Sequence, residues 1–177
     1  LIIGNASPEN SDMNVVLDHY IRLDNRIKVI NIKSNHGIAQ NTNIALTAAT
    51  GEFIGFMDHD DILAPDALFE FVLKLESDSK IDFIYTDEDK VTTDLNKYFQ
   101  PHFKPDFNLD LLRSNNYICH FFAVRKTIIE QVGVLCEEYD GAQDYDFILR
   151  CTEASRKIAH IPRILYHWRV HNSSTAD

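Results

Sequence analysis

The chain has no long hydrophobic run and few basic residues. Its apolar stretches fall short of the roughly 20 residues that a helix needs to cross a bilayer, so we expect no transmembrane helix. Only 17 Lys and Arg accompany 27 Asp and Glu, which gives a formal net charge of −10 over 177 residues. Nucleic-acid phosphates need a basic surface, so this balance argues against a nucleic-acid-binding role. An acidic protein that binds an anionic nucleotide needs a metal ion to neutralise the charge locally.

Cysteine is also scarce. The three cysteines are an odd number without CxxC spacing, which indicates reduced, mostly buried thiols of a cytosolic protein and excludes a disulfide framework or zinc site of the usual pattern. Repeats, linkers and low-complexity segments are lacking as well. With 45% hydrophobic residues, residues 1–177 are expected to form a single domain with a substantial core.

Apolar runs of strand length alternate with segments of helical periodicity in the first half of the chain. Because such alternation is typical of crossover connections, it predicts an α/β fold with a mainly parallel sheet and helices on both faces. Pro65 is expected to open a helix with Leu68, Phe69, Val72 and Leu75 toward the core. The expected strands are 1–3, 27–32, 53–57 and 81–86, and the expected helices are 11–23, a segment ending near 49, and one opening at 65.

The regular alternation of strands and helices ends after residue 87. An extended segment is expected over 94–117, with a short helix near 109–112. Further strands are expected at 117–124, 158–161 and 164–170, and further helices at 126–132 and about 143–154. The chain opens without Met inside the apolar run 1–3, so we expect a piece of a longer protein, cut within or just before a strand.

Three carboxylates follow the apolar run 53–57. Alternation along a strand would point Asp58 and Asp60 the same way, at the end of a strand where open α/β sheets bind ligands. The two carboxylates repel each other unless a cation lies between them, and a hard divalent ion with free positions for phosphate oxygens suits that need. The alternative is that Asp60 or Asp61 caps the next helix.

A second acidic cluster, residues 87–89, follows the apolar run 81–86. In a doubly wound sheet both strand ends share one edge, so the two clusters are expected to be neighbours. The alternative is a solvated acidic loop. His102 and His160 are interpreted as ordinary surface histidines.

Asp144 follows Gly141 and lies in the first turn of an expected helix, where the helix dipole favours its charge. Placement at a helix N-terminus explains it without any further role. A carboxylate at a pocket rim also serves as a general base that accepts a proton from a sugar hydroxyl.

The last strand carries His167, Arg169 and His171 on one face by alternation. A histidine there is able to complete a carboxylate metal site, and Arg169 is able to contact a diphosphate.

Asn35, Gly37 and Asn43 form a weaker feature. They are placed to present amide groups and a helix N-terminus to a nucleotide, although turn and cap roles explain Asn35 and Gly37 equally well.

Together these residues resemble glycosyltransferase family 2, which has the GT-A fold. The nucleotide-sugar half of that family is similar to Asn35-x-Gly37, Asn43 and the segment from Ala49 to the DxD motif Asp58-His59-Asp60. A bacterial branch that makes O-antigen and rhamnose-rich surface polysaccharides is similar in the ordered segments 85–90, 103–106, 116–120, 143–146 and 160–163.

The resemblance implies inverting transfer from a nucleoside diphosphate sugar to a glycan or lipid-linked acceptor, with Mn²⁺ or Mg²⁺. Asp60 would be the main metal ligand, Asp58 would contact the ribose or the metal, and Asp144 would be the base. His171, in a Tyr-x-x-Arg-x-His-x-x-Ser pattern, would contact the metal or diphosphate, with His167 second and Arg169 on the diphosphate. Residues 1–90 would bind the nucleotide sugar, and residues 91–177 would bind the acceptor and carry the base.

The chain departs from the family pattern at three places. The first strand of the family, its loop and its first helix are absent from this sequence. Asn5 stands where members usually have an acidic pair, and its amide would still bond a nucleotide base. Thr42 stands where many members carry an arginine, which removes one phosphate contact. The resemblance places the protein in the cytoplasm, at the inner face of the plasma membrane if its acceptor is lipid-linked. A non-catalytic nucleotide-sugar-binding module and a sugar nucleotidyltransferase are the alternatives.

Overall fold

The computed structural model describes residues 1–171. These residues form two compact units. The first unit comprises residues 1–51 and 133–147, and the second unit comprises residues 52–132 and 148–171. The predicted division into residues 1–90 and 91–177 concerns function and stays a prediction.

The first unit contains a parallel pair of strands. Strand β1 (Ile2–Asn5) pairs with β2 (Lys28–Asn31), and helix α1 (Ser11–Leu23) connects them. Helix α1 begins where it does because the Asn10 side chain accepts a hydrogen bond from the Met13 amide at 3.0 Å. This strand–helix–strand order agrees with the sequence prediction.

Two long-range contacts join the two segments of the first unit. The Asp140 carboxylate accepts a hydrogen bond from the Ala39 amide at 2.9 Å, which caps helix α2 (Ile38–Leu46). The Asn43 amide binds both backbone groups of Leu135, at 2.8 and 3.0 Å. The remaining elements of this unit are the 3-10 helix η1 (Glu137–Tyr139) and the beginning of α6 (Gln143–Ala154).

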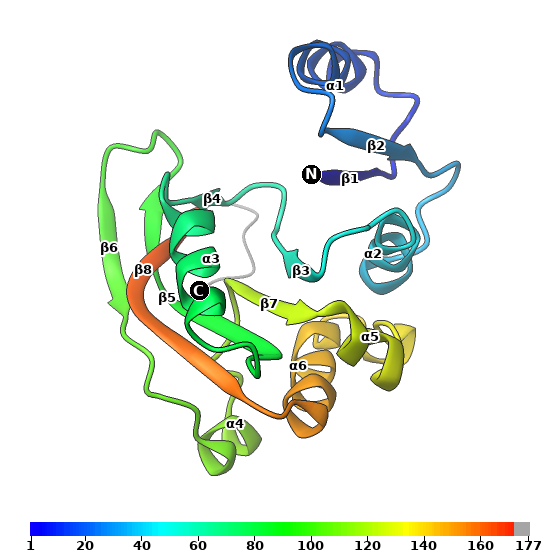
Figure 1. Ribbon diagram of the computed structural model, residues 1–177. Coiled ribbons are helices and arrows are strands. Elements are labelled where there is room, and N and C mark those ends of the chain that lie inside the picture. The colour runs from blue at the N-terminus through cyan, green and yellow to red at the C-terminus, as the bar shows by residue number, and fades with distance from the viewer. Residues whose placement is uncertain (172–177) are drawn as a thin grey trace. The chain divides into compact units, whose positions relative to one another are not determined.

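The second unit is built around a six-stranded sheet in the order β3-β7-β5-β8-β4, with β6 also paired to β5 (Figure 1). Strand β8 pairs with the whole length of β5, so β7 and β6 share the other edge of β5. The strands are β3 (Phe53–Phe56), β4 (Ile62–Leu63), β5 (Phe83–Thr92), β6 (Tyr98–His102), β7 (Phe122–Arg125) and β8 (Ile158–Val170). The helices are α3 (Ala67–Ser77), α4 (Leu109–Ser114), α5 (Lys126–Val132) and most of α6.

The α/β class with flanking helices is confirmed, but the expectation of a mainly parallel sheet is wrong for the second unit. Only β5 and β8 are parallel there, and the other four pairings are antiparallel. Strands β3 and β5 do run in the same direction, because both are antiparallel to β7. The crossover from β3 to β5 was therefore predicted correctly, and β7 from later in the chain inserts between them.

The core of the second unit lies between α3 and the sheet, as Figure 1 shows for α3 over β5 and β8. Ala67 and Phe71 are buried there, and Leu75 packs against the same cluster. The prediction for Leu68, Phe69 and Val72 was wrong, since their exposed fractions are 64%, 66% and 57%. Ala67, Phe71 and Leu75 are spaced at i, i+4 and i+8, so they share one face of α3, and this face packs against the sheet.

Strand β8 replaces the two short strands predicted at 158–161 and 164–170. Its register with β5 shifts around Pro162 and Arg163, because Thr86 pairs with Ile161 and Asp87 with Ile164. Proline lacks a backbone N–H, which explains why the ladder is irregular there. The irregularity bends one continuous strand instead of ending it.

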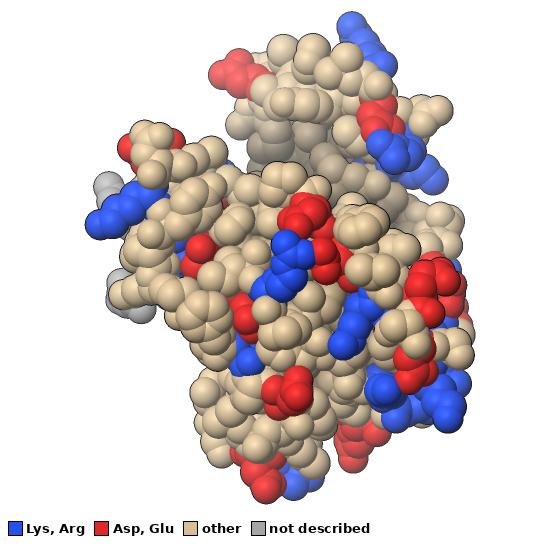
Figure 2. Space-filling model, turned by 60° about the vertical axis from the view of Figure 1, so that its left-hand side comes forward, with Lys and Arg blue, Asp and Glu red and all other residues tan. Residues whose placement is uncertain are grey.

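The surface mixes both signs of charge. Figure 2 shows basic side chains lying next to acidic ones on the face in view. Arg163, for example, pairs with Asp66 at 2.8 Å and also contacts Glu70. Among residues 1–171, no helix is long and apolar enough to cross a membrane.

Candidate functional site

The acidic triplet lies in a turn between β3 and β4, within the second unit. The capping alternative is wrong, because α3 begins only after β4 and its N-cap residue is Asp66. The three carboxylates have different environments. The Asp58 side chain is 54% exposed and that of Asp60 is 29% exposed, whereas Asp61 is buried.

Asp61 attaches the turn to strand β8. Its carboxylate accepts hydrogen bonds from the Tyr166 hydroxyl and, at 2.8 Å, from the Arg169 backbone amide. Burial raises the pKa of Asp61, and the nearby charges of Asp60 and Asp58 act in the same direction. Asp61 therefore supports the turn from inside and leaves Asp58 and Asp60 on its accessible side.

Asp60 contacts the end of β8 directly. Its Oδ2 lies 2.7 Å from Nε2 of His171, and the Arg169 guanidinium donates to its backbone carbonyl at 2.5 Å. Burial opposes ionisation of Asp60, but the hydrogen bond from His171 and the neighbouring dipoles and charges outweigh it, so the pKa of Asp60 lies below its ordinary value. The carboxylate is thus held in its anionic form, which is the form that binds a cation.

These groups suit a divalent cation. Two accessible carboxylates and one imidazole nitrogen provide the oxygen and nitrogen ligands that Mn²⁺ accepts, and the carboxylates alone suit Mg²⁺. Asp58, Asp60 and His171, predicted from separate parts of the sequence, all belong to the second unit. The structure brings Asp60 and His171 into contact, and their metal-binding roles stay predictions.

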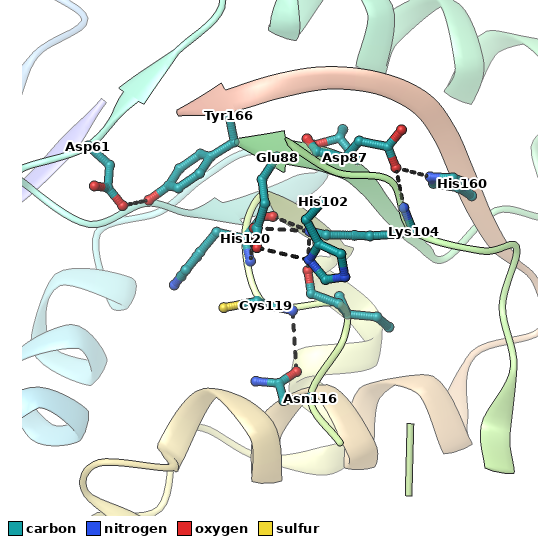
Figure 3. A network of polar contacts seen from close by, with 12 residues as sticks. Asp61, Asp87, Glu88, His102, Lys104, Asn116, Cys119, His120, His160 and Tyr166 are labelled. Carbon is teal, nitrogen blue, oxygen red and sulfur yellow. Dashed lines mark hydrogen bonds and ion pairs between the residues drawn. The ribbon is translucent and has the colours of Figure 1, made fainter. Parts of the chain in front are cut away.

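Tyr166 connects both sides of the acidic turn. Its ring is fully buried, and its hydroxyl accepts a hydrogen bond from the Asp58 amide at 3.4 Å while donating to Asp61. The His120 ring stacks on Tyr166 with centroids 5.3 Å apart, and His120 Nε2 lies 3.5 Å from Asp58 Oδ2. Figure 3 shows Tyr166 directed at Asp61, with His120 nearby.

The second acidic cluster is not a loop. Strand β5 continues through residues 87–89, and all three carboxylates are buried within it. Each has a cationic or imidazole partner: Asp87 lies 2.8 Å from His160, Glu88 lies 3.0 Å from Lys104, and Asp89 lies 2.6 Å from His167. These contacts offset the free-energy cost of removing the three carboxylates from water. A strand with three acidic residues can therefore lie in the core.

The surface prediction is wrong for His160, whereas His102 lies at the surface as predicted and also contacts an acidic side chain. His160 is buried and contacts Asp87, while its ring stacks on Tyr85 at 4.8 Å. His102 is half-exposed and contacts Glu88 at 3.3 Å. His167, the second choice for the metal, contacts Asp89, which is its neighbour across the β5–β8 ladder.

Four of the predicted nucleotide contacts lie in the first unit, whereas Asp58 and Arg169 belong to the second. Asn5 is buried, where its amide donates to Asn14 and Asn31 and accepts from the Ser7 amide. Asn35 accepts from the Gly37 amide at 3.0 Å, which is an Asx-turn arrangement.

Asn43 binds Leu135, and Gly37 adopts a φ of 91° before α2. Turn and packing contacts thus account for the four residues Asn5, Asn35, Gly37 and Asn43, and their nucleotide-binding roles stay predictions. Asp144 lies in the first turn of α6, as predicted.

Sequence reasoning missed the contributions of Lys104, His120 and Tyr166. The signal for Lys104 is a lysine between Phe103 and Pro105 in an otherwise aromatic segment. Tyr166 begins the Tyr-x-x-Arg-x-His pattern and His120 ends the segment 116–120, but no local pattern indicates that their rings stack on each other.

Residues 1–133 match the sequence profile of glycosyl transferase family 2. The chain belongs to glycosyl transferase family 2. The predicted resemblance is therefore confirmed, and the domain is of the glycosyltransferase class.

Curated relatives also align with residues beyond 133. The uncharacterized protein y4gI of Sinorhizobium fredii is 38% identical over 178 residues, which is 99% of this chain and 20% of that protein. The O-antigen biosynthesis protein RfbC of Myxococcus xanthus is 40% identical over 154 residues, which is 87% of this chain and 12% of that protein. The chain thus spans about a fifth or less of the length of these two relatives.

Solved structures confirm the GT-A fold. S. aureus TarS 1–349 in complex with UDP-GlcNAc superposes with a TM-score of 0.71 at 18% identity, covering 93% of this chain and 48% of the 1–349 chain. The mannosyltransferase PcManGT from Pyrobaculum calidifontis, in complex with GDP-Man and Mn²⁺, superposes with a TM-score of 0.67 at 16% identity, covering 95% of this chain and 47% of that one.

Proposed function

We propose that this family 2 domain transfers a sugar from a nucleoside diphosphate sugar to a glycan or lipid-linked acceptor in bacterial surface-polysaccharide synthesis, with a divalent cation and with inversion at the anomeric carbon. The Asp60–His171 contact at 2.7 Å beside the exposed Asp58 carboxylate is the observation that carries the proposal. It joins the DxD segment to the histidine near the end of β8, two features that were assigned to one cation from sequence.

The comparisons support the chemical class of the substrates. TarS and PcManGT are described with UDP-GlcNAc and with GDP-Man and Mn²⁺, respectively. RfbC is named for O-antigen biosynthesis, and more distant relatives include chondroitin and hyaluronan synthases of Pasteurella multocida. Glycosyl transfer is accordingly favoured over sugar nucleotidyl transfer.

Three side chains of the second unit would hold the cation. Asp60 would be the main ligand, with Asp58 and His171 completing the protein ligands. When bound, a divalent cation stabilises the negative charge that develops on the departing diphosphate. Asp61 and Tyr166 hold the turn in place, so that the two ligand carboxylates need little reorganisation when the cation enters. Arg169 would add positive charge toward the diphosphate.

Asp144 is the proposed base. The resemblance and its place in the first turn of α6 support this assignment. In the reaction, the acceptor hydroxyl oxygen forms a bond to the anomeric carbon while its proton passes to the Asp144 carboxylate. The bond from the anomeric carbon to the nucleoside diphosphate breaks on the opposite face, which inverts the configuration. A base of this kind contributes on the order of 10²–10⁴-fold to the rate.

A donor screen tests the proposal. The protein is incubated with UDP- and GDP-sugars and an extract of bacterial glycolipids, with Mn²⁺ or with EDTA, and products are identified by mass spectrometry and anomeric NMR. We expect transfer with inversion from one donor class and none with EDTA. Donor binding without transfer would contradict catalysis and favour a binding module, and transfer with retention would contradict the mechanism.

A further inference from the structure

Lys104 is a buried cation for which the proposed mechanism has no use. Its side chain is fully buried, and burial lowers its pKa despite the nearby Glu88 carboxylate. Its ammonium group donates to Glu88 Oε2 at 3.0 Å, to the Ile118 carbonyl at 2.6 Å and to the His120 carbonyl. An ammonium has three donors, so these three acceptors satisfy it completely.

Glu88 completes the contact with the same segment. Its Oε2 accepts a hydrogen bond from the His120 backbone amide at 3.3 Å, and its Oε1 lies 3.3 Å from His102. The Lys104–Glu88 ion pair therefore binds both the amide and the carbonyl of His120. Figure 3 shows Lys104 and Glu88 next to the chain segment that carries Cys119 and His120.

Strand β5 also fixes the segment that carries Lys104. Asp87 Oδ1 accepts from the Lys104 amide at 2.9 Å, and the Tyr85 hydroxyl donates to the Pro105 carbonyl at 2.6 Å. Side chains of β5 thus hold the backbone on both sides of the lysine. Lys104 thus links β5 to His120 through hydrogen bonds at both its backbone and its side chain.

The His120 side chain extends from this hydrogen-bonded segment toward the acidic turn. Its ring stacks on Tyr166, and Nε2 lies 3.5 Å from Asp58 Oδ2. Its Nδ1 is buried and has no hydrogen-bond partner within residues 1–171. Unsatisfied buried polar atoms are rare and call for an explanation such as a bound ion, a water or a catalytic role. A buried ion pair is itself weak evidence for stability, so a role in placing His120 explains its presence better.

We propose that the Lys104–Glu88 ion pair positions His120 and that the His120 imidazole orients the Asp58 carboxylate for the cation and the diphosphate. The inference rests on the proposed function. His120 and Lys104 are positioning residues in this scheme, since they act through Asp58. Partners that orient metal-ligating groups typically change metal affinity by about 10–100-fold when removed.

Binding measurements on the full chain test the inference without relying on turnover. Calorimetry gives the Mn²⁺ concentration needed for half-maximal binding of UDP or GDP, and thermal unfolding is followed in parallel. His120→Phe keeps a ring against Tyr166 and leaves the ion pair intact. Lys104→Met combined with Glu88→Gln removes both charges of the pair. Asp82→Asn is the matched control, because Asp82 is a buried carboxylate paired with arginines and lies outside this network.

We expect His120→Phe to raise the required Mn²⁺ concentration about 10-fold or more with little change in melting temperature. The double variant should raise it by a similar factor and also lower the melting temperature. Asp82→Asn should lower the melting temperature and leave the Mn²⁺ requirement unchanged. If the double variant does not fold, Glu88→Gln alone replaces it with the same expected direction.

Wild-type Mn²⁺ dependence in His120→Phe would overturn the inference and leave the proposed function standing. A Mn²⁺ requirement that rises equally in Asp82→Asn would also overturn it, since the effect would then follow stability alone. Failure of the wild-type chain to bind UDP or GDP with Mn²⁺ would overturn the proposed function and this inference together.

Discussion

His171 Nε2 lies 2.7 Å from Oδ2 of Asp60, although 111 positions separate the two residues in the chain. The contact is possible because β4, which follows the acidic turn, pairs antiparallel with β8 through Ile62 and His167. Strand pairing therefore determines which histidine meets the turn.

Asp60→Asn should weaken Mn²⁺-dependent nucleotide binding by about 100-fold, the upper end of the range for groups that only support a ligand. Asp58→Asn should weaken it less, because the Asp58 side chain is more exposed and has fewer protein contacts. Titration calorimetry with Mn²⁺ and UDP or GDP measures both. Asp78→Asn is the control, since Asp78 pairs with Lys157 outside the turn, and equal losses in all three variants would argue against a cation at Asp60.

Asp144→Asn should lower kcat by about 10²–10⁴-fold and leave donor binding unchanged, because the amide accepts no proton from the acceptor. Asp146→Asn, in the same helical turn, should change kcat far less and serves as the control. Steady-state kinetics with the donor identified in the screen provide the measurement. Wild-type turnover in Asp144→Asn would contradict the assignment of the base.

Asp82 should make the stability of the chain sensitive to acid. The hydrogen bond from Arg156 lowers the pKa of Asp82, with further support from Arg125, even though burial acts in the opposite direction. A lowered folded-state pKa means that the unfolded chain binds more protons, so this contribution is present above the ordinary Asp pKa of about 3.9 and is lost as the pH falls below it.

The free energy of unfolding, measured with urea, should therefore be lower in Asp82→Asn than in the wild type at pH 7. The difference should shrink as the pH falls from about 4 toward the lowered pKa of folded Asp82, because the unfolded wild-type chain takes up a proton at this carboxyl before the folded chain does. Arg163→Gln, which removes exposed ion pairs, should have a small effect at either pH. A difference that stays constant across this range would contradict the assignment.

The two phenylalanines of α3 should respond differently to truncation. Phe71 is 5% exposed and contacts the Phe121 ring with centroids 5.0 Å apart, so Phe71→Ala should cost about 3–5 kcal/mol in the free energy of unfolding. Phe69 is 66% exposed, and Phe69→Ala should change it by less than about 0.5 kcal/mol. Urea titration of both variants at one pH measures the two changes in the free energy of unfolding. Equal losses in Phe71→Ala and Phe69→Ala would contradict the exposed position of Phe69.

Several local elements could be predicted because their signals are local. Helices 11–23, 126–132 and 143–154 agree with α1, α5 and α6, since caps and periodicity act within a few residues of the sequence. Phe147, Ile148 and Cys151 are buried on α6 as expected. The register of α3 was not predictable from spacing, because Phe69 and Phe71 are equally apolar and only the position of the sheet selects one.

The extent of strand β5 could not be predicted from local signals. The sequence predicts that the strand ends before residues 87–89, because three successive acidic residues are unfavourable in a core unless they are paired. Their partners Lys104, His160 and His167 come from distant segments, and no local pattern indicates them.

The order of residues alone determined the α/β class, the family and the acidic turn at Asp58 and Asp60, because each depends on short motifs and local periodicity. Tertiary structure alone decided that β7 inserts between β3 and β5 and that His120 lies beside Asp58. The physical reason is that hydrogen-bonded pairing between strands, and the burial of charges that it permits, depend on segments far apart in the chain.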